Sequence, residues 1–296
     1  MYPTIRVFSR VIDWNFRAMD MLQASLVAIF SWWFATGIML MSVRYADRAG
    51  GDAHILTLVT AFPVAVLGGV AVVESLSNVH QSGAYFGFIG ALCIWGWIEL
   101  AFLTGIITGP RRDQCPEHLC VMGRWKHAWG VLAYHEISLL LGFIGLLVVS
   151  WSAPNITAVM TYGILFFARI AAKLNLFFGV PRINLQFLPD KLSHLHSLLR
   201  KGPLTIVFPV SLGFLIISLI FIHSLVSIVE HPGVHVAHGL LITLIGLALL
   251  EHILMVVPLP DAKLWNWMLP DNRQGTWNPH WKKRLDLEEK GTWDEL

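Results

Sequence analysis

The sequence predicts an all-α integral membrane protein, a bundle of about seven transmembrane helices with an interfacial amphipathic helix at its N-terminus. Of the 296 residues, 55% are hydrophobic and 14% are charged, and the mean hydropathy is +0.62. Ordinary soluble domains have about 25% charged residues. The hydrophobic residues also gather in long segments, several of which reach the length of about 20 residues that crosses a bilayer as a helix.

The first element, residues 1–23, is predicted to be an amphipathic helix that lies at the membrane interface. Arg6, Arg10, Asp13 and Arg17 recur on one face of such a helix, and apolar side chains recur near the other. The stretch lacks the continuous apolar core and the cleavage site of a secretory signal. It is therefore expected to be an interfacial helix that leads into the first span.

Residues 24–268 are predicted to form the membrane domain. Its expected spans are 24–43, 55–74, 85–108, 128–151, 156–177, 204–229 and 236–258. The longest connection, 179–203, is basic and has prolines at its start, middle and end, which predicts a structured loop. The remainder, 269–296, is expected to be a polar tail that carries tryptophans.

The distribution of Lys and Arg predicts the orientation. The first, third and fifth connections and the tail contain these residues, whereas the second, fourth and sixth connections contain none. Short cytoplasmic loops carry the excess of Lys and Arg. The N-terminus is therefore expected in the periplasm and the C-terminus in the cytoplasm, although three arginines in the N-terminal helix argue the other way.

The remaining composition excludes several classes of protein. The formal net charge is +2, and the basic residues lie in short loops rather than in one stripe, so no nucleic-acid partner is expected. Cys93, Cys115 and Cys120 give no disulfide framework, and the spacing of the last two is not that of a zinc or redox pair. Thirteen tryptophans, several of them near span ends, fit an aromatic belt.

Four of the expected spans place ionisable residues at a similar depth. Counted from the predicted cytoplasmic end of each span, these residues lie about six to nine positions inside, or roughly 9–14 Å at 1.5 Å per residue. Ionisable residues inside a membrane usually face the bundle interior and pair with one another. The predicted polar layer, with two neighbours on the fifth span, consists of Glu99, His135, Glu136, Arg169, Lys173, Asn175, Glu251 and His252.

The residues alone leave three interpretations of this layer open. It can be an internal network of ion pairs and hydrogen bonds that fixes helix packing. It can be a metal site, because carboxylates and histidines from several helices are the ligands of di-iron bundles, although the Glu-x-x-His spacing of those bundles is missing. The adjacent pairs His135-Glu136 and Glu251-His252 instead diverge by about 100° around their helices. Contact with a pigment or a quinone is the third possibility.

A second group of histidines lies toward the opposite face of the membrane. Histidines at this depth are more often surface or turn residues than ligands, but His235 and His238 are spaced so that they could bind a metal or the magnesium of a chlorin. The possible pigment or metal ligands in this group are His80, His223, His235 and His238.

The order of short motifs along the chain resembles the PuhE family of photosynthetic complex assembly proteins, found in purple and related phototrophic bacteria. The resemblance covers roughly residues 27–268. Its motifs include Gly83-Ala84-Tyr85, Trp95-Gly96-Trp97 followed by Glu99, Thr108-Gly109-Pro110-Arg111, Tyr134-His135-Glu136, Ala172-Lys173-Leu174-Asn175, Phe178-Gly179-Val180-Pro181 and Leu250-Glu251-His252.

The resemblance implies a membrane protein that assists assembly of, or stays bound as an accessory subunit to, the reaction centre and light-harvesting core complex. Its membrane would be the inner, photosynthetic intracytoplasmic membrane, and contact with bacteriochlorophyll or a carotenoid would be possible. It implies no catalytic residues, which favours a protein that is not an enzyme. The alternative is a membrane oxidoreductase that acts on a tetrapyrrole, a carotenoid or a quinone and holds iron in the polar layer. A transporter ranks last because no inverted repeat is visible.

The chain departs from the family pattern in three places. Position 98 is Ile, where a polar residue, often His, is expected between Trp and Glu, and this lowers the odds of metal chemistry. The N-terminal helix is an extension, and so is the tail 271–296. Tryptophans that no core of their own could bury suggest that the tail is a docking surface.

Overall fold

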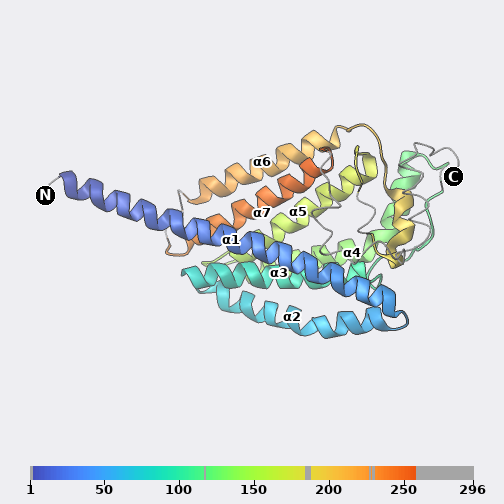
Figure 1. Ribbon diagram of the computed structural model, residues 1–296, viewed down its shortest axis with the longest axis horizontal. Helices are drawn as coiled ribbons and strands as arrows, with labels where there is room; N and C mark the ends of the chain where they lie inside the picture. Colours follow the sequence, from blue (N-terminus) through green and yellow to red (C-terminus); the bar gives the residue numbers. More distant parts are fainter. Residues whose placement is uncertain (1–2, 117, 184–187, 227, 229–230, 258–296) are drawn as a thin grey trace.

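The structure is an all-helical bundle (Figure 1). The computed structural model describes residues 3–116, 118–183, 188–226, 228 and 231–257, with side chains from residue 17 onward except at 226. Its elements are α1 (Pro3–Ala49), α2 (Ala53–Leu76), α3 (Gln81–Leu103), α4 (Val121–Val149), α5 (Thr157–Phe178), the 3-10 helix η2 (Asp190–Leu198), α6 (Val207–Val226) and α7 (Val234–Leu254). The seven long helices are each apolar enough to cross a bilayer. The chain is thus a multi-pass membrane protein, and the predicted fold class is confirmed.

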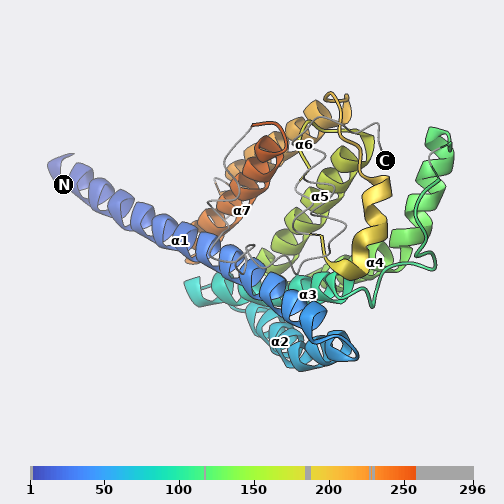
Figure 2. The same ribbon diagram turned by 45° about the vertical axis from the view of Figure 1, so that its right-hand side comes forward.

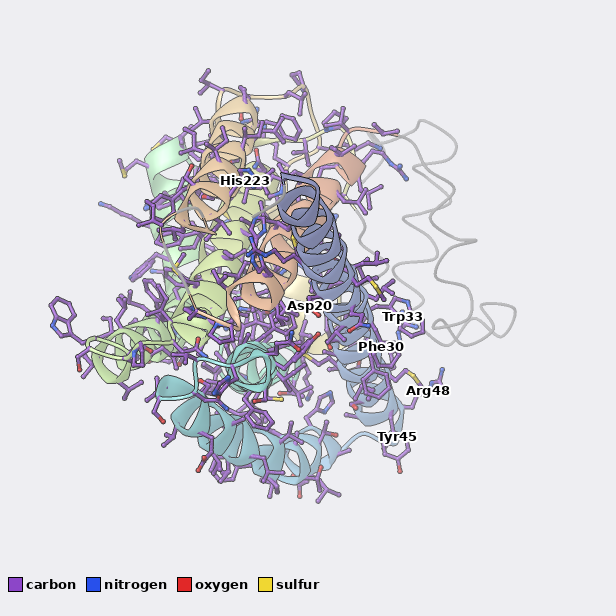
Figure 3. All side chains as sticks on the ribbon, turned by 90° about the vertical axis from the view of Figure 1, so that its left-hand side faces the viewer. Asp20, Phe30, Trp33, Tyr45, Arg48 and His223 are labelled. Atoms are coloured by element: carbon purple, nitrogen blue, oxygen red, sulfur yellow. The ribbon has the colours of Figure 1, made fainter. Side chains whose placement is uncertain are left out.

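α1 is one continuous helix of 47 residues. The expected N-terminal helix and the first span therefore join without a break, and residue 23 marks no end of a helix. Figures 1 and 2 show the N-terminal part of α1 projecting beyond the other helices. Farther along, Phe30, Trp33, Tyr45 and Arg48 point away from the bundle (Figure 3). Phe30 and Tyr45 are exposed, as expected for a face toward lipid.

α3 lies at the centre of the bundle, and α2 packs closely along it. Two glycines permit this approach. A Cβ atom added to Gly68 would lie 2.7 Å from the Cβ of Cys93 and 2.9 Å from the carbonyl oxygen of Gly90. Small residues at such contacts let helix backbones come close together in membrane proteins.

α3 ends five residues before the expected end of its span. The hydroxyl of Thr104 donates to the carbonyl oxygens of Leu100 and Ala101, and Gly105 then adopts a positive φ of 73°. Glycine tolerates this left-handed conformation, which is a common way to end a helix. The apolar run of the sequence continues past the turn, which explains why the sequence alone extended the span to residue 108.

The Thr108-Gly109-Pro110-Arg111 turn docks directly on α4. The backbone N–H of Arg111 donates to the carbonyl of Gly130 at 3.0 Å, and the N–H of His135 donates to the carbonyl of Thr108 at 3.0 Å. A Cβ at Gly109 would collide with the backbone of residues 130–131. α4 begins seven residues before its expected start, and it turns away from the bundle toward its N-terminal end (Figure 2). Insertion of other groups into a helical hydrogen-bond ladder is a known cause of such bends.

The described part of the connection 179–203 is structured, as expected. The N–H of Val180 donates to the carbonyl of Arg200, and the N–H of Gly202 donates to the carbonyl of Val180, so the two ends of the loop are tied together. Between them, η2 buries leucines against α3, α4 and α5. The sequence did not predict this 3-10 helix.

Candidate functional site: a charged core beside a membrane cavity

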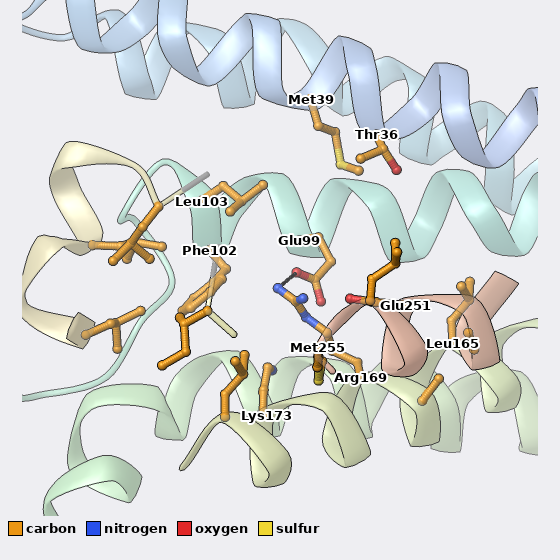
Figure 4. Close-up of a pocket in the computed structure, with 18 of the residues that line it drawn as sticks. Thr36, Met39, Glu99, Phe102, Leu103, Leu165, Arg169, Lys173, Glu251 and Met255 are labelled. Atoms are coloured by element: carbon orange, nitrogen blue, oxygen red, sulfur yellow. Dashed lines mark hydrogen bonds and ion pairs between the residues drawn. The ribbon is translucent and has the colours of Figure 1, made fainter. Parts of the chain in front are cut away.

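Glu99 is the centre of the polar layer. It lies on α3 and is only 2% exposed. Its Oε2 accepts a hydrogen bond from Nη2 of Arg169 on α5 at 3.1 Å (Figure 4). Its Oε1 lies 3.6 Å from Nε2 of His135 on α4. A buried carboxylate is tolerated when it is paired in this way. One ionic group thus connects three helices.

His135 is held in place from two sides. Its ring stacks on Phe102 with 4.2 Å between the ring centroids, and its backbone N–H is bound by the Thr108 turn described above. The side chain is fully buried. The turn at Thr108 therefore positions a histidine of the polar layer.

A second ion pair lies beside the first. Nζ of Lys173 donates to Oε1 of Glu136 at 2.5 Å and lies 5.7 Å from the ring centroid of Phe102. Both partners of this pair keep some surface accessible, 18% for the lysine side chain and 17% for the glutamate side chain. The arrangement joins α5 to α4 once more.

The other three predicted members of the layer take part in neither ion pair. Asn175 on α5 donates to Oγ of Ser211 on α6 and to the carbonyl of Ala171, so it ties two helices together. His252 is fully buried, with its Nδ1 2.8 Å from the carbonyl oxygen of Ala248. Glu251 is exposed, and Figure 4 shows its carboxylate directed toward Arg169 and Glu99.

A cavity of about 500 Å³ lies against the charged groups (Figure 4). α1, α3, α5 and α7 form most of its wall, and leucines of η2 close one end. Four members of the predicted layer line it: Glu99, Arg169, Lys173 and Glu251. Most of the rest is apolar, with Trp32, Trp95 and Phe102 among the aromatic residues. Mostly apolar cavities with a few convergent polar groups are typical of small-molecule sites.

The five residues that could have held iron do not converge. Glu136 binds Lys173, Nδ1 of His252 lies near the carbonyl oxygen of Ala248 on its own helix, and Glu99 contacts both Arg169 and His135. Across the described ranges, no three His, Cys, Asp or Glu side chains are grouped so that they could hold a metal ion. The adjacent spacing of His135-Glu136 and Glu251-His252, which directs neighbours to different sides of a helix, explains this result.

The second histidine group gathers at the other end of the bundle. Nδ1 of His223 lies 3.3 Å from Nε2 of His238, which joins the end of α6 to the start of α7. His80 is exposed just before α3, and its turn is bound to the start of α7 through the N–H of Gly233 and the carbonyl of Val79. His235 is half-buried. The two ring nitrogens of the close pair face each other, so this geometry favours a direct contact between the histidines.

Several residues of the site were not predicted. Thr36 and Trp32 of α1 line the cavity, and Ser211 receives the amide of Asn175. The hydroxyl of buried Tyr162 donates to the carbonyl of Leu139 at 3.1 Å and lies where a Cβ on Gly142 would be. Of these residues, only Trp32 stands out in the sequence, as a tryptophan within an apolar span, and the sequence predicts an aromatic belt for such tryptophans.

These observations define a class: a seven-helix membrane protein with a charged core and an apolar cavity beside it. The chain belongs to the family described as a protein of unknown function (DUF3623), whose model matches residues 18–276. It is 43% identical over 246 residues to an uncharacterized 30.4 kDa protein in the puhA 5′ region of Rhodobacter capsulatus. That match covers 83% of this chain and 90% of the relative. No solved structure matches the chain.

Proposed function

We propose that the protein takes part in bacterial photosynthesis as a membrane component that is not an enzyme. In this role it assists assembly of, or stays bound to, the reaction centre and light-harvesting core complex. Two sequence observations support the proposal. The motifs of residues 27–268 resemble the PuhE family, and the Rhodobacter capsulatus relative belongs to the puhA 5′ region. The membrane would be the bacterial inner, photosynthetic membrane.

The geometric observation that carries the proposal is the internal pairing of the polar layer. Glu99 with Arg169 and Glu136 with Lys173 neutralise one another across three helices, so these charges have a structural use without a reacting substrate. Exposed apolar side chains are abundant on the outer faces of α1, α2 and α6. In this proposal those faces contact lipid, helices of the core complex and their bacteriochlorophyll or carotenoid. The tail 269–296, which lies outside the described residues, remains a proposed docking segment.

The test is purification of a tagged full-length copy from phototrophically grown cells in a mild detergent. We expect reaction-centre or light-harvesting subunits to co-purify, together with near-infrared pigment absorption. A tagged polytopic protein of the same membrane, unrelated in sequence, controls for incomplete solubilisation. The proposal fails if those subunits are not enriched over this control.

The same preparation tests the oxidoreductase alternative. Metal analysis of the wild type would show stoichiometric iron if the polar layer held it, and Glu99→Ala and His135→Ala would both lose that iron. The observed pairing instead predicts that metal content is the same in the wild type and both variants. Iron lost in both folded variants would replace the proposal with a redox enzyme.

A further inference from the structure

The cavity offers hydrogen-bond donors on one wall. Arg169 uses Nη2 for Glu99 but keeps 30% of its side chain accessible, and it lines the cavity. Lys173, 18% accessible, lines the same wall. A guanidinium and an ammonium can only donate, so a molecule bound here has to present acceptor oxygens to them.

The balance of charge limits what that molecule can be. The basic groups in or beside the cavity are Arg169, Lys173 and Arg182, and the acidic groups are Glu99, Glu136 and Glu251. Three positive charges against three negative charges leave no excess to attract an anion such as a phosphate or a fatty-acid carboxylate. The exposed carboxylate of Glu251 would repel one further. A neutral head group with carbonyl oxygens meets both conditions, because it accepts hydrogen bonds from Arg169 and Lys173 and carries no negative charge.

The shape and lining of the cavity add two more conditions. Trp32, Trp95 and Phe102 supply aromatic surfaces against which a flat ring can pack. The rest of the lining is dominated by leucines from α5, α7 and η2, which suit an aliphatic tail. A volume of about 500 Å³ lies in the range of cavities that bury small organic ligands.

We infer that this cavity binds a neutral ring carbonyl compound with an aliphatic tail, of the quinone class, with Arg169 and Lys173 donating to a ring oxygen. The inference concerns binding alone and includes no redox step. It does not depend on the proposed place in photosynthesis. It is based on two features of the cavity. Accessible cationic donors lie on one wall, and the lining as a whole is balanced in charge and mostly aromatic and apolar.

The experiment measures binding of decylubiquinone, a short-chain quinone, to the purified full-length protein by equilibrium dialysis in detergent, with protein-free micelles as the blank. We expect saturable binding of one molecule per chain. Lys173→Met removes one donor, and we expect the apparent Kd to rise by about tenfold, the worth of one hydrogen bond to a charged group.

A matched pair of variants tests the location. Thr36 lines the cavity from α1, whereas Ile38, two residues on, is 47% exposed and lies outside the lining. Thr36→Phe fills the cavity and is expected to abolish saturable binding, while Ile38→Phe retains it. Gel filtration of each variant checks that it is folded.

Three outcomes overturn the inference. Equal binding by the Thr36→Phe and Ile38→Phe proteins would mean that the quinone only partitions into the micelle or the outer surface. No saturable binding to the wild type would exclude the class. A co-purifying lipid, chlorin or carotenoid that decylubiquinone cannot displace would assign the cavity to that molecule instead.

Discussion

At the residue scale, the molecule is arranged around one buried carboxylate. Glu99 is placed on the central helix so that an arginine and a histidine from two other helices reach it. Removing one partner of such a pair leaves an uncompensated charge, and this costs more than the pair contributes when complete. Replacing Glu99 and Arg169 together is therefore expected to cost less stability than replacing either residue alone.

The Glu99–Arg169 pair gives the first prediction. We expect Glu99→Leu and Arg169→Leu each to lower the free energy of unfolding by about 3 kcal/mol, since each strands a charge inside the bundle. The double variant is expected to recover at least half of the loss of the two single variants combined. Unfolding in mixed detergent and SDS micelles measures this. Strictly additive losses would show that the two groups do not stabilise each other.

The neighbouring pair serves as a comparison for that measurement. Lys173 and Glu136 keep 18% and 17% of their side chains accessible, whereas Glu99 is 2% exposed, so breaking this pair leaves a charge that is less completely buried. Glu136→Gln is therefore expected to cost clearly less than Glu99→Leu in the same assay. A loss equal to that of Glu99→Leu would show that the partial accessibility of the Glu136–Lys173 pair does not weaken its contribution to stability.

At the scale of helices, glycines at the contact between α2 and α3 allow the two backbones to approach closely. Gly68 faces Gly90 and Cys93 across this contact, whereas Gly69, the next residue of the same helix, has nothing within 4 Å of where its Cβ would be. Two adjacent glycines thus have opposite tolerance for a side chain.

The adjacent glycines make the second prediction. Gly68→Ala is expected to destabilise the protein by about 1–3 kcal/mol, because the added methyl group forces two helices apart. Gly69→Ala is expected to be neutral or slightly stabilising, since alanine favours helix by about 0.5–1 kcal/mol over glycine. The SDS unfolding midpoint of each variant gives the comparison. Equal midpoints would contradict close packing at Gly68.

Asp190, the first residue of η2, is half-buried near Asp47 at the end of α1 and His54 at the start of α2. Burial raises the pKa of the Asp190 carboxyl above its ordinary value, the carboxylate of Asp47 raises it further, and His54 lowers it. Nε2 of His54 also lies 2.8 Å from Asp47. Because the fold favours protonated Asp190, its ionisation works against docking of η2. Docking is thus weakened as the pH rises from the ordinary aspartate pKa through the raised one.

Asp190→Asn gives the third prediction. The variant should protect the amides of η2 from hydrogen exchange better than the wild type at neutral pH, and the two should be equal below the ordinary aspartate pKa. Mass spectrometry at matched pH values measures this difference. The control is Asp52→Asn, which changes an exposed aspartate in the turn between α1 and α2. Protection that is equal at every pH would show that Asp190 does not govern the docking.

The sequence predicted helices better than it predicted their rotation about their axes. Hydropathy and span length placed the seven helices, and the depth count placed Glu99, His135 and Arg169 at one level, where the structure brings them together. The depth of a residue does not tell which side of its helix it faces. His252 therefore shares the predicted depth but lies beside the carbonyl oxygen of Ala248 on its own helix rather than in the ion pairs. Gly105 ended α3 early inside an apolar run, which hydropathy cannot detect. The cavity wall from α1 depends on how helices pack, and no local pattern encodes it.

At the scale of the whole molecule, the fourth prediction concerns orientation in the membrane. The third connection should face the cytoplasm, because it is rich in arginine. Cys120, exposed at the start of α4, then reacts with a membrane-impermeant maleimide in inside-out vesicles but not in intact spheroplasts. Cys93 is half-buried and Cys115 is buried, so Cys120 dominates the labelling.

A reciprocal variant completes this test. Ser152 is exposed in the fourth connection, on the opposite predicted side. In a Cys120→Ser background, Ser152→Cys should react in intact spheroplasts. Labelling of both sites from the same side would contradict the bundle, and reversed labelling of both would place the N-terminus in the cytoplasm.

The length of α1 has a consequence for anything attached to the N-terminus. A helix of 47 residues measures about 70 Å, whereas the hydrocarbon core of a bilayer measures about 30 Å. The part of α1 in excess of the bilayer continues the same helix, so the number of residues in α1 sets both the height and the direction of its N-terminal end. Deleting one residue from its middle would lower the N-terminal end by about 1.5 Å and rotate it by about 100°. Deleting seven residues would lower the N-terminal end while nearly restoring its original direction. A series of deletions therefore separates the effect of height from the effect of direction.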